Sequence, residues 1–187
     1  MADTTSKSGK HKDLSDLFLH GIQDIYYAEK KLTKALPKMI EAAQSHELAG
    51  ALSNHLAETQ EHVTKVERVF ALLDKKPKAT KCDAIDGIVK ETGSILEDFG
   101  DTEAGDAAII FAGQAAEHYE ITRYGSLAAF AQFLHYDAAE TILRGILEQE
   151  KAADKKLTEL AEDRIDFAAA AVLGMQDSNS KVIPVRY

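Results

Sequence analysis

Proline is almost absent from the periodic parts of this chain. Only Pro37, Pro77 and Pro184 occur, and residues 83–174 contain none. Proline breaks a helix because it lacks a backbone N–H and its ring meets the preceding turn. The same stretches are rich in Ala, Leu, Glu and Lys, which have high helix propensities. No segment alternates strictly between apolar and polar residues against a β-branched background, so the sequence predicts an all-α protein.

Apolar residues recur every three to four positions, which is the spacing of one helix face. Long helices joined by a short connection pack as antiparallel neighbours. We therefore expect two helical hairpins, with a short extra helix between them and a C-terminal helix after them. Pro37 lies inside the first helix, where we expect a kink or a local break. The expected helices span residues 14–44, 47–73, 83–97, 102–131, 137–163 and 165–173, and the last ends at Gly174.

The length of 187 residues corresponds to one domain with small appendages. We expect the helical bundle to occupy residues 13–174. Residues 1–12 are rich in Lys, Ser and Thr and predict a disordered tail. Residues 175–187 form a mostly polar C-terminal tail. Ser45 is the expected N-cap of the second helix.

The charge balance narrows the classes of function. The chain has 31 Asp and Glu against 22 Lys and Arg, a net charge of −9, which argues against a nucleic-acid groove. No apolar run approaches the roughly 20 residues that a membrane span needs, and the polar N-terminus does not resemble a signal peptide. A single cysteine, Cys82, excludes an internal disulfide framework and fits the cytoplasm, where we expect the protein.

Acidic side chains fall on the apolar faces of all four long helices. Carboxylates of amphipathic helices normally face water, and Glu61 and Glu148 do so in a projection that advances 100° per residue. Other acids, and one histidine, share the sector of the apolar stripe instead. These inward candidates are Glu29 in the first helix, Glu58 and His62 in the second, Glu117 and Glu120 in the third long helix, and Glu150 and Asp154 in the fourth.

Two of these helices carry a pair of candidate ligands four residues apart, Glu58 with His62 and Glu150 with Asp154. Both members of such a pair can reach one point, because they lie one turn apart on the same face. Burying several carboxylates together is strongly unfavourable unless something neutralises them. Water or protonation could do so, but a pair of metal cations does it better, as in di-metal carboxylate bundles. We therefore predict two metal ions per chain.

Four further residues have a plainer interpretation. His55 shares the apolar sector of its helix, but a lone histidine there is more often a hydrogen-bonded core residue than a ligand. His118 points outward and is assigned no role. Tyr124 lies near the acids in angle and is interpreted as a packing residue. Cys82 begins the short helix and is interpreted as a small buried residue rather than a redox thiol.

Several segments resemble the YciE/YciF family of bacterial stress-associated proteins. The resemblance covers residues 13–163 and is most distinctive in the run Ala-Glu-His-Tyr-Glu-Ile that begins at Ala116. It implies a ferritin-like four-helix bundle, similar to rubrerythrin, that forms a homodimer. The other matching segments are Tyr27-Ala28-Glu29-Lys30-Lys31-Leu32, His55-Leu56-Ala57-Glu58-Thr59, Lys81-Cys82-Asp83-Ala84-Ile85-Asp86-Gly87, Tyr124-Gly125-Ser126-Leu127 and Glu150-Lys151-Ala152-Ala153-Asp154 with Leu157-Thr158-Glu159-Leu160-Ala161.

The resemblance also implies a di-metal centre. The chain departs from a rubrerythrin-like site, because two of its ligand pairs are four residues apart instead of three and Asp154 stands where a histidine is usual. A site rich in carboxylate and poor in histidine suits iron or manganese better than copper. Carried over from rubrerythrin-like sites, the ligands fall on Glu29, on Glu58 with His62, on Glu117 with Glu120, and on Glu150 with Asp154.

Three functions are compatible with such a centre. They are redox chemistry on peroxide or dioxygen during stress, metal sequestration without an organic substrate, and a non-catalytic structural role. The sequence contains no Cys-x-x-Cys pair, so the rubredoxin-type iron site that completes a rubrerythrin is absent and the electron donor is unknown. The short helix near Ile85–Leu96 and the apolar segment from Ile165 exceed what a four-helix bundle needs, so we expect them to form a two-fold dimer interface.

Overall fold

The computed structural model describes residues 12–176, with side chains up to residue 171, and this part of the chain is helical throughout its regular structure. Residues 1–11 and 177–187, where most of both predicted tails fall, lie outside the described residues. The helices are α1 (Leu14–Ala42), α2 (His46–Leu72), α3 (Asp83–Phe99), α4 (Gly105–Phe133) and α5 (Asp137–Leu160), then the π-helical turn η1 (Ala161–Ile165) and α6 (Asp166–Gln176).

The predicted all-α class is therefore confirmed, and each predicted helix is present with its ends shifted by a few residues. α1 continues through Pro37 as one helix, so the local break is absent. Its neighbours Leu36 and Met39 are buried in the core and hold this turn in place despite the missing N–H. Ser45 caps α2 as predicted, because its Oγ accepts a hydrogen bond from the Leu48 N–H at 3.3 Å.

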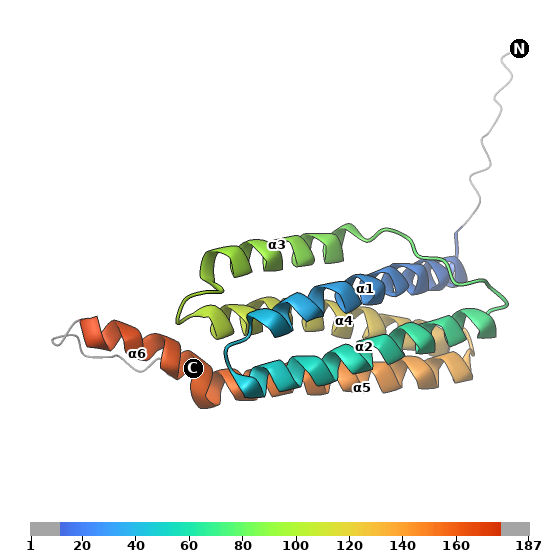
Figure 1. The fold of residues 1–187 in the computed structure, drawn as a ribbon. Helices are drawn as coiled ribbons and strands as arrows, with labels where there is room; N and C mark the ends of the chain where they lie inside the picture. The colour runs from blue at the N-terminus through green and yellow to red at the C-terminus, as the bar shows by residue number, and fades with distance from the viewer. Residues whose placement is uncertain (1–11, 177–187) are drawn as a thin grey trace, which may run out of the picture.

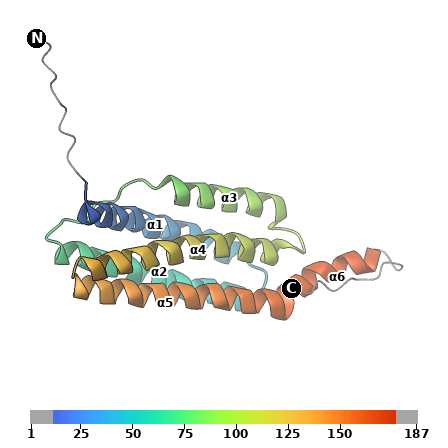
Figure 2. The ribbon, with the colours of Figure 1, turned by 180° about the vertical axis from the view of Figure 1, so that it is seen from behind.

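Four helices form the bundle as two hairpins, α1 with α2 and α4 with α5 (Figure 1). The α3 helix lies along α1 and α4, outside the four (Figure 1). The opposite view shows α6 extending beyond the end of the bundle from the end of α5 (Figure 2). At Gly21 the backbone of α1 lies against the Leu127 side chain of α4, and an added Cβ would lie 2.7 Å from Leu127 Cδ2.

The bundle has two apolar clusters instead of one continuous core. One is built around Phe18, Ile22, Leu143 and their neighbours, and the other around Leu48 and Ile109 with theirs. On α2 and α5 the buried polar residues fall between the positions that contribute to the two clusters, and on α4 Glu117 and Glu120 follow Ala116 of the first cluster. The middle of the bundle is therefore polar and has an apolar layer on either side.

The α3 helix is attached by both apolar and polar contacts, with Ile88, Val89 and Leu96 partly buried against the two apolar clusters. It buries only Ile85 and Thr92, while Asp86 accepts a hydrogen bond from Tyr27 at 2.9 Å and pairs with Lys31 at 2.8 Å. Just before α3, Cys82 Sγ lies 3.0 Å from the hydroxyl of a tyrosine on α4. This cysteine is buried, as predicted. Within residues 12–176 no helix has the length and apolar character that crossing a membrane requires.

Candidate metal centre

The polar middle of the bundle contains two groups of side chains that could hold metal ions. Within each group, one potential ligand atom from every residue lies within 4.8 Å of the others. Glu150 belongs to both groups, so a ligand on α5 connects them. All four helices of the bundle contribute. The first group is His55, Glu117, Glu120 and Glu150, and the second is Glu29, His62 and Glu150.

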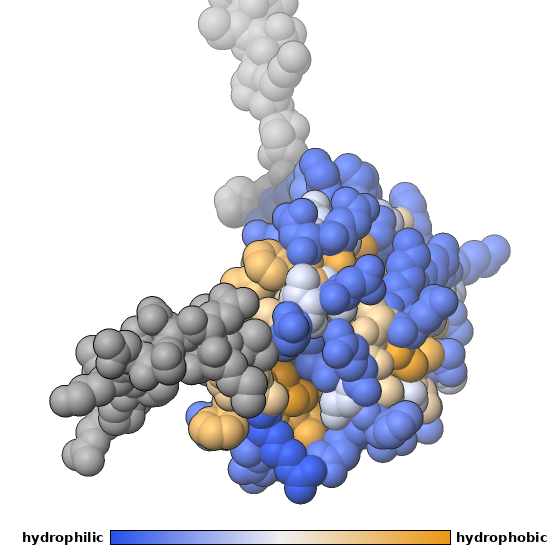
Figure 3. Space-filling view, turned by 60° about the vertical axis from the view of Figure 1, so that its left-hand side comes forward, coloured by the Kyte–Doolittle hydropathy of each residue, from blue (hydrophilic) through white to orange (hydrophobic). Residues whose placement is uncertain are grey.

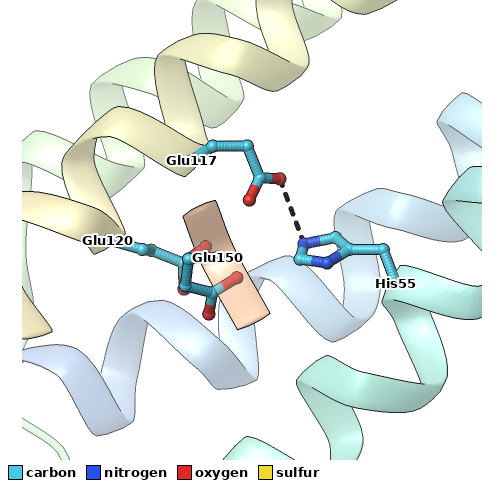
Figure 4. Close-up of side chains that lie close together, drawn as sticks. All are labelled: His55, Glu117, Glu120 and Glu150. Atoms are coloured by element: carbon cyan, nitrogen blue, oxygen red, sulfur yellow. Dashed lines mark ion pairs between the residues drawn. The ribbon is translucent and has the colours of Figure 1, made fainter. Parts of the chain in front are cut away.

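The first group is centred on an ion pair between α2 and α4. His55 Nε2 lies 3.1 Å from Glu117 Oε1, and both side chains are buried. The carboxylates of Glu120 and Glu150 lie together beside this pair (Figure 4). Three carboxylates and one imidazole therefore converge on one region of the core.

The second group is enclosed more completely. His62 Nδ1 lies 3.0 Å from Glu150 Oε1 and 3.5 Å from Glu29 Oε1, and none of the three side chains is more than 1% exposed. The hydroxyl of Tyr124 donates a short hydrogen bond to Glu29 Oε1. Glu29 is thereby held by one oxygen, while its Oε2 has no partner.

A glutamine outside the two groups sets the orientation of His62. Gln149 Oε1 lies 3.3 Å from His62 Nε2 and also accepts a hydrogen bond from Lys65 Nζ at 2.7 Å. Because this oxygen is an acceptor, His62 Nε2 keeps its proton in both the charged and the neutral ring, and Nδ1 faces the two carboxylates. Metal-binding histidines commonly donate their other ring N–H to such a partner, which fixes the ring and its tautomer.

Many ligand atoms of these groups lack a hydrogen-bond partner among the described residues. Buried polar atoms in native proteins are nearly always paired, and an unpaired one is costly. A concentration of unpaired atoms on facing helices therefore indicates that a ligand completes the site. The atoms are Glu29 Oε2, His55 Nδ1, Glu117 Oε2, Glu120 Oε1 and Glu150 Oε2, whereas Glu150 Oε1 and His62 Nδ1 face each other as an ion pair at 3.0 Å.

The two histidines are charged when no metal is present. Burial lowers the pKa of His55, but the hydrogen bond to Glu117 and the surrounding carboxylates outweigh it and raise the pKa to about 9. Burial also opposes protonation of His62, whose bonds to Glu150 and Glu29 raise its pKa to about 10. The protonated rings thus partly neutralise the acids in the metal-free protein.

The carboxylates are held in a medium that disfavours their charge. Burial raises the pKa of Glu29 and of Glu150, although His62 lowers both in part. Burial and then the charges of Glu150, Glu29 and Glu117 raise the pKa of Glu120 well above 4.5, with no compensating partner. The metal-free site therefore combines desolvation with mutual repulsion, which bound cations would relieve.

This donor set fits a pair of divalent metal ions. The four carboxylates of the two groups carry the charge that two divalent cations would neutralise once both histidines are neutral. Carboxylate oxygen with imidazole nitrogen suits iron and manganese, whereas copper or structural zinc sites favour sulfur and more histidine. Glu29, His62, Glu117, Glu120 and Glu150, which the sequence predicts as ligands, all lie in the groups.

Two predicted ligands lie outside both groups. The Glu58 side chain is 42% exposed, with Oε2 at 3.9 Å from His55 Nδ1. Asp154 is 22% exposed and lies 3.2 Å from His118 Nε2, and it also accepts a hydrogen bond from Gln114. His118 itself is 70% exposed, in agreement with its outward phase.

Sequence reasoning did not select His55 as a ligand candidate, although the structure places it in the first group. The signal that could have found it is its spacing from His62. The two are seven residues apart, close to two helical turns, so they share one face of α2. Gln149 was also missed, because its role depends on contacts between helices.

Comparisons with known proteins agree with this architecture. The family model described as a domain of unknown function, DUF892, matches residues 13–170. Protein YciF of Escherichia coli is 40% identical over 159 residues, which cover 84% of this chain and 96% of YciF. The crystal structure of that stress protein has a TM-score of 0.79 at 39% identity and covers 83% of this chain and 99% of its own.

Two further solved structures extend the comparison. YcfI of Rhodopseudomonas palustris is 45% identical with a TM-score of 0.78, covering 82% of this chain and 98% of YcfI. A two-domain protein of Anabaena variabilis that contains a ferritin-like domain is 16% identical with a TM-score of 0.50, covering 100% of this chain and 48% of that one. At this low identity the match shows only the fold, which is ferritin-like. With its family model matching nearly the whole helical bundle, this chain belongs to the DUF892 family of YciF-like proteins.

Proposed function

We propose that this protein binds two iron or manganese ions in the middle of its bundle, one in each group of ligands. The single observation that carries the proposal is the set of buried, unpartnered ligand atoms contributed by four helices. Glu150 is shared by the groups and would bridge the two ions. A ferritin-like bundle supplies the inward side chains that such centres use.

Bound iron or manganese would supply one-electron redox chemistry with peroxide or dioxygen. The chain supports that chemistry by excluding water from the second group, whose side chains are almost fully buried. Tyr124 holds its phenolic proton on the hydrogen bond to Glu29, and burial first, then the nearby carboxylates, raise the pKa of Tyr124 well above 10. Gln149 fixes the orientation of His62.

The similarity to the stress protein YciF supports a role during stress. The alternative is a non-catalytic metal-binding or structural role for the same ions, which the almost complete enclosure of Glu29, His62 and Glu150 favours. The two functions differ in turnover. Hydrogen peroxide consumption by metal-loaded protein, supplied with a reductant, distinguishes them.

The test of the metal site is elemental analysis after reconstitution with Fe²⁺ under anaerobic conditions or with Mn²⁺. We expect close to two ions per chain, as in di-metal carboxylate bundles. Glu150→Ala should lose both ions, because it removes the shared ligand. Its matched control is Glu148→Ala on the same helix, since Glu148 is 70% exposed and pairs only with Lys151 among the described ion pairs. Wild-type protein that binds no metal after reconstitution would refute the proposal.

A further inference from the structure

A large cavity opens onto one end of the candidate metal centre. It has a volume of about 1000 Å³ and lies between the beginning of α2 and the end of α5, with η1 at its edge. Both His55 and Glu117 line it, so solvent reaches the first group from this side. In the view towards this end of the molecule, apolar surface is visible among mainly hydrophilic residues (Figure 3). The apolar part of the cavity wall includes Ala51, Ala153 and Leu157.

The opposite group of the centre has no comparable opening. Glu29 and His62 are 0% exposed, and neither lines the cavity. An apolar cluster also covers that end of the bundle. An ion that reaches the second group from the cavity must therefore pass the first group.

His55 stands between the cavity and the inner carboxylates. Its Nε2 faces Glu117 at 3.1 Å, whereas its Nδ1 is buried, has no hydrogen-bond partner and lies 3.9 Å from Glu58 Oε2. The side chain is only 8% exposed. An unpartnered imidazole nitrogen thus lies beside a carboxylate that also lines the cavity.

Glu58 is held in this position by the neighbouring helix. Gln149 Nε2 lies 3.5 Å from Glu58 Oε1, and the same amide is fixed by Lys65 through its oxygen. The Oε2 atom remains on the side of His55. The Glu58 carboxylate therefore has one oxygen held, and its other oxygen lies next to the unpartnered His55 Nδ1, which carries a proton until a cation displaces it.

We propose that Glu58 and His55 Nδ1 form an entry site at which divalent cations from the cavity are captured before they pass to Glu117 and the inner groups. This inference rests on the proposed function and assigns Glu58 a role in loading instead of in the final coordination. The half-exposed carboxylate attracts the cation, and His55 lies between this site and Glu117. Negative charge in such an opening raises the local cation concentration and the rate of association.

Loading kinetics test the entry site. Metal-free full-length protein is mixed with Co²⁺, whose visible absorption reports binding, and the final stoichiometry is measured separately. Glu58→Gln should slow loading on the order of tenfold, as expected for the loss of electrostatic steering, and should leave the stoichiometry equal to that of the wild type. The control Glu61→Gln, which changes a 69% exposed glutamate on the same helix, should leave both unchanged.

A second variant tests the route without changing charge. Ala153 lines the cavity, so Ala153→Leu should narrow it and slow loading, again with unchanged stoichiometry. Ala57→Leu, at an exposed position of α2 that does not line the cavity, is its control. Circular dichroism of the metal-free variants checks that each one is folded.

Each negative result of these experiments has a different interpretation. Unchanged loading rates in both Glu58→Gln and Ala153→Leu would overturn the entry site while leaving the metal centre intact. A lower stoichiometry in Glu58→Gln would also overturn it, because Glu58 would then be a ligand in the final site. Wild-type protein that binds no Co²⁺, Fe²⁺ or Mn²⁺ would instead refute the proposed function.

Discussion

Replacing Glu120 by methionine should stabilise the metal-free protein and weaken the metal-loaded one. Glu120 is 1% exposed, its Oε1 has no hydrogen-bond partner, and three other carboxylates oppose its charge. Replacing a buried ion pair by apolar residues of similar size is often neutral or stabilising by about 1–4 kcal/mol, and Glu120 has no ion-pair partner whose loss would offset such a gain. For a domain of this size a gain of about 2 kcal/mol raises the melting temperature by about 4–8 °C.

Bound metal reverses the relative stability of the wild type and Glu120→Met. A ligand at a hundred times its Kd stabilises the protein that binds it by about 2.7 kcal/mol. The wild-type chain gains this stabilisation, whereas Glu120→Met loses one carboxylate of the first group. Wild type should therefore be the less stable chain in chelator and the more stable one with excess Mn²⁺.

The stability gained by Glu120→Met also depends on pH, and the direction of this dependence follows from the raised pKa of Glu120. The unfolded chain deprotonates this side chain near pH 4.5, whereas burial and then the neighbouring carboxylates raise its pKa well above that in the folded state. The wild type therefore loses stability as the pH rises from 4.5 towards the folded pKa, and the variant does not share this loss. The difference should be small in acid and largest at neutral pH.

Urea unfolding in chelator and in excess Mn²⁺ measures both effects. Glu61→Met is the control, because Glu61 is 69% exposed and a surface change of this kind moves stability by less than about 0.5 kcal/mol. Metal-free Glu120→Met that is less stable than wild type at pH 7 by about 1 kcal/mol or more would refute the reasoning, since the carboxylate would then be stabilised by its surroundings.

Three further predictions follow from other contacts. Metal binding at pH 7 should release at least two protons per chain, because His55 and His62 have pKa values of about 9 and about 10 and must become neutral to bind metal. Calorimetry in buffers of different ionisation enthalpy measures the release. Asp86→Asn should destabilise the protein at pH 7, because it weakens the ion pair with Lys31 and the hydrogen bond from Tyr27. The hydrogen bonds from Lys31 and then from Tyr27 lower the pKa of Asp86 below 3.8. In urea unfolding, the stability difference between Asp86→Asn and the wild type should therefore disappear as the pH falls through that lowered pKa. The chain should form a homodimer through α3 and α6, and light scattering at micromolar concentration that gives the mass of a monomer would contradict it.

The helical phase was sufficient to find most of the candidate ligands. Glu29, Glu117, Glu120 and Glu150 lie at the centre of the inward sector of their helices, and the structure buries all four. A regular helix keeps its angular period over many turns, so the direction of a side chain follows from its position in the sequence. The exposed positions of Glu61 and Glu148 follow from the same rule.

The phase alone did not decide the positions of Glu58, at the edge of its inward sector, and of Asp154, which the projection placed in the middle of its own. A projection gives the direction of a side chain but not which neighbour covers it. Glu58 lies where α2 borders a cavity, and Asp154 lies where Gln114 and His118 of α4 reach it. These contacts depend on the distances between helices, which a single sequence does not contain.

The role of His55 was hidden for a related reason. An isolated histidine on an apolar face gives no sign of its partners, and its pairing with Glu117 joins residues that are 62 positions apart. The π-helical turn at Ala161–Ile165 was not predicted either. The apolar pattern resumes there without a proline or glycine to mark the change in hydrogen bonding.

Because α3 supplies no ligand to either group, it can open without removing a ligand from the candidate metal centre. The helix buries only two of its residues, so it can detach as a local unfolding unit while the four ligand-bearing helices stay together. In a hydrogen-exchange experiment the amides of α3 would report the low free energy of this local opening, and bound metal would leave their exchange rates unchanged. The amides of α4 and α5 near the ligands would instead exchange through global unfolding, which bound metal makes rarer. The protein would thus have two levels of stability, one that depends on the bound ions and one that depends on the packing of α3.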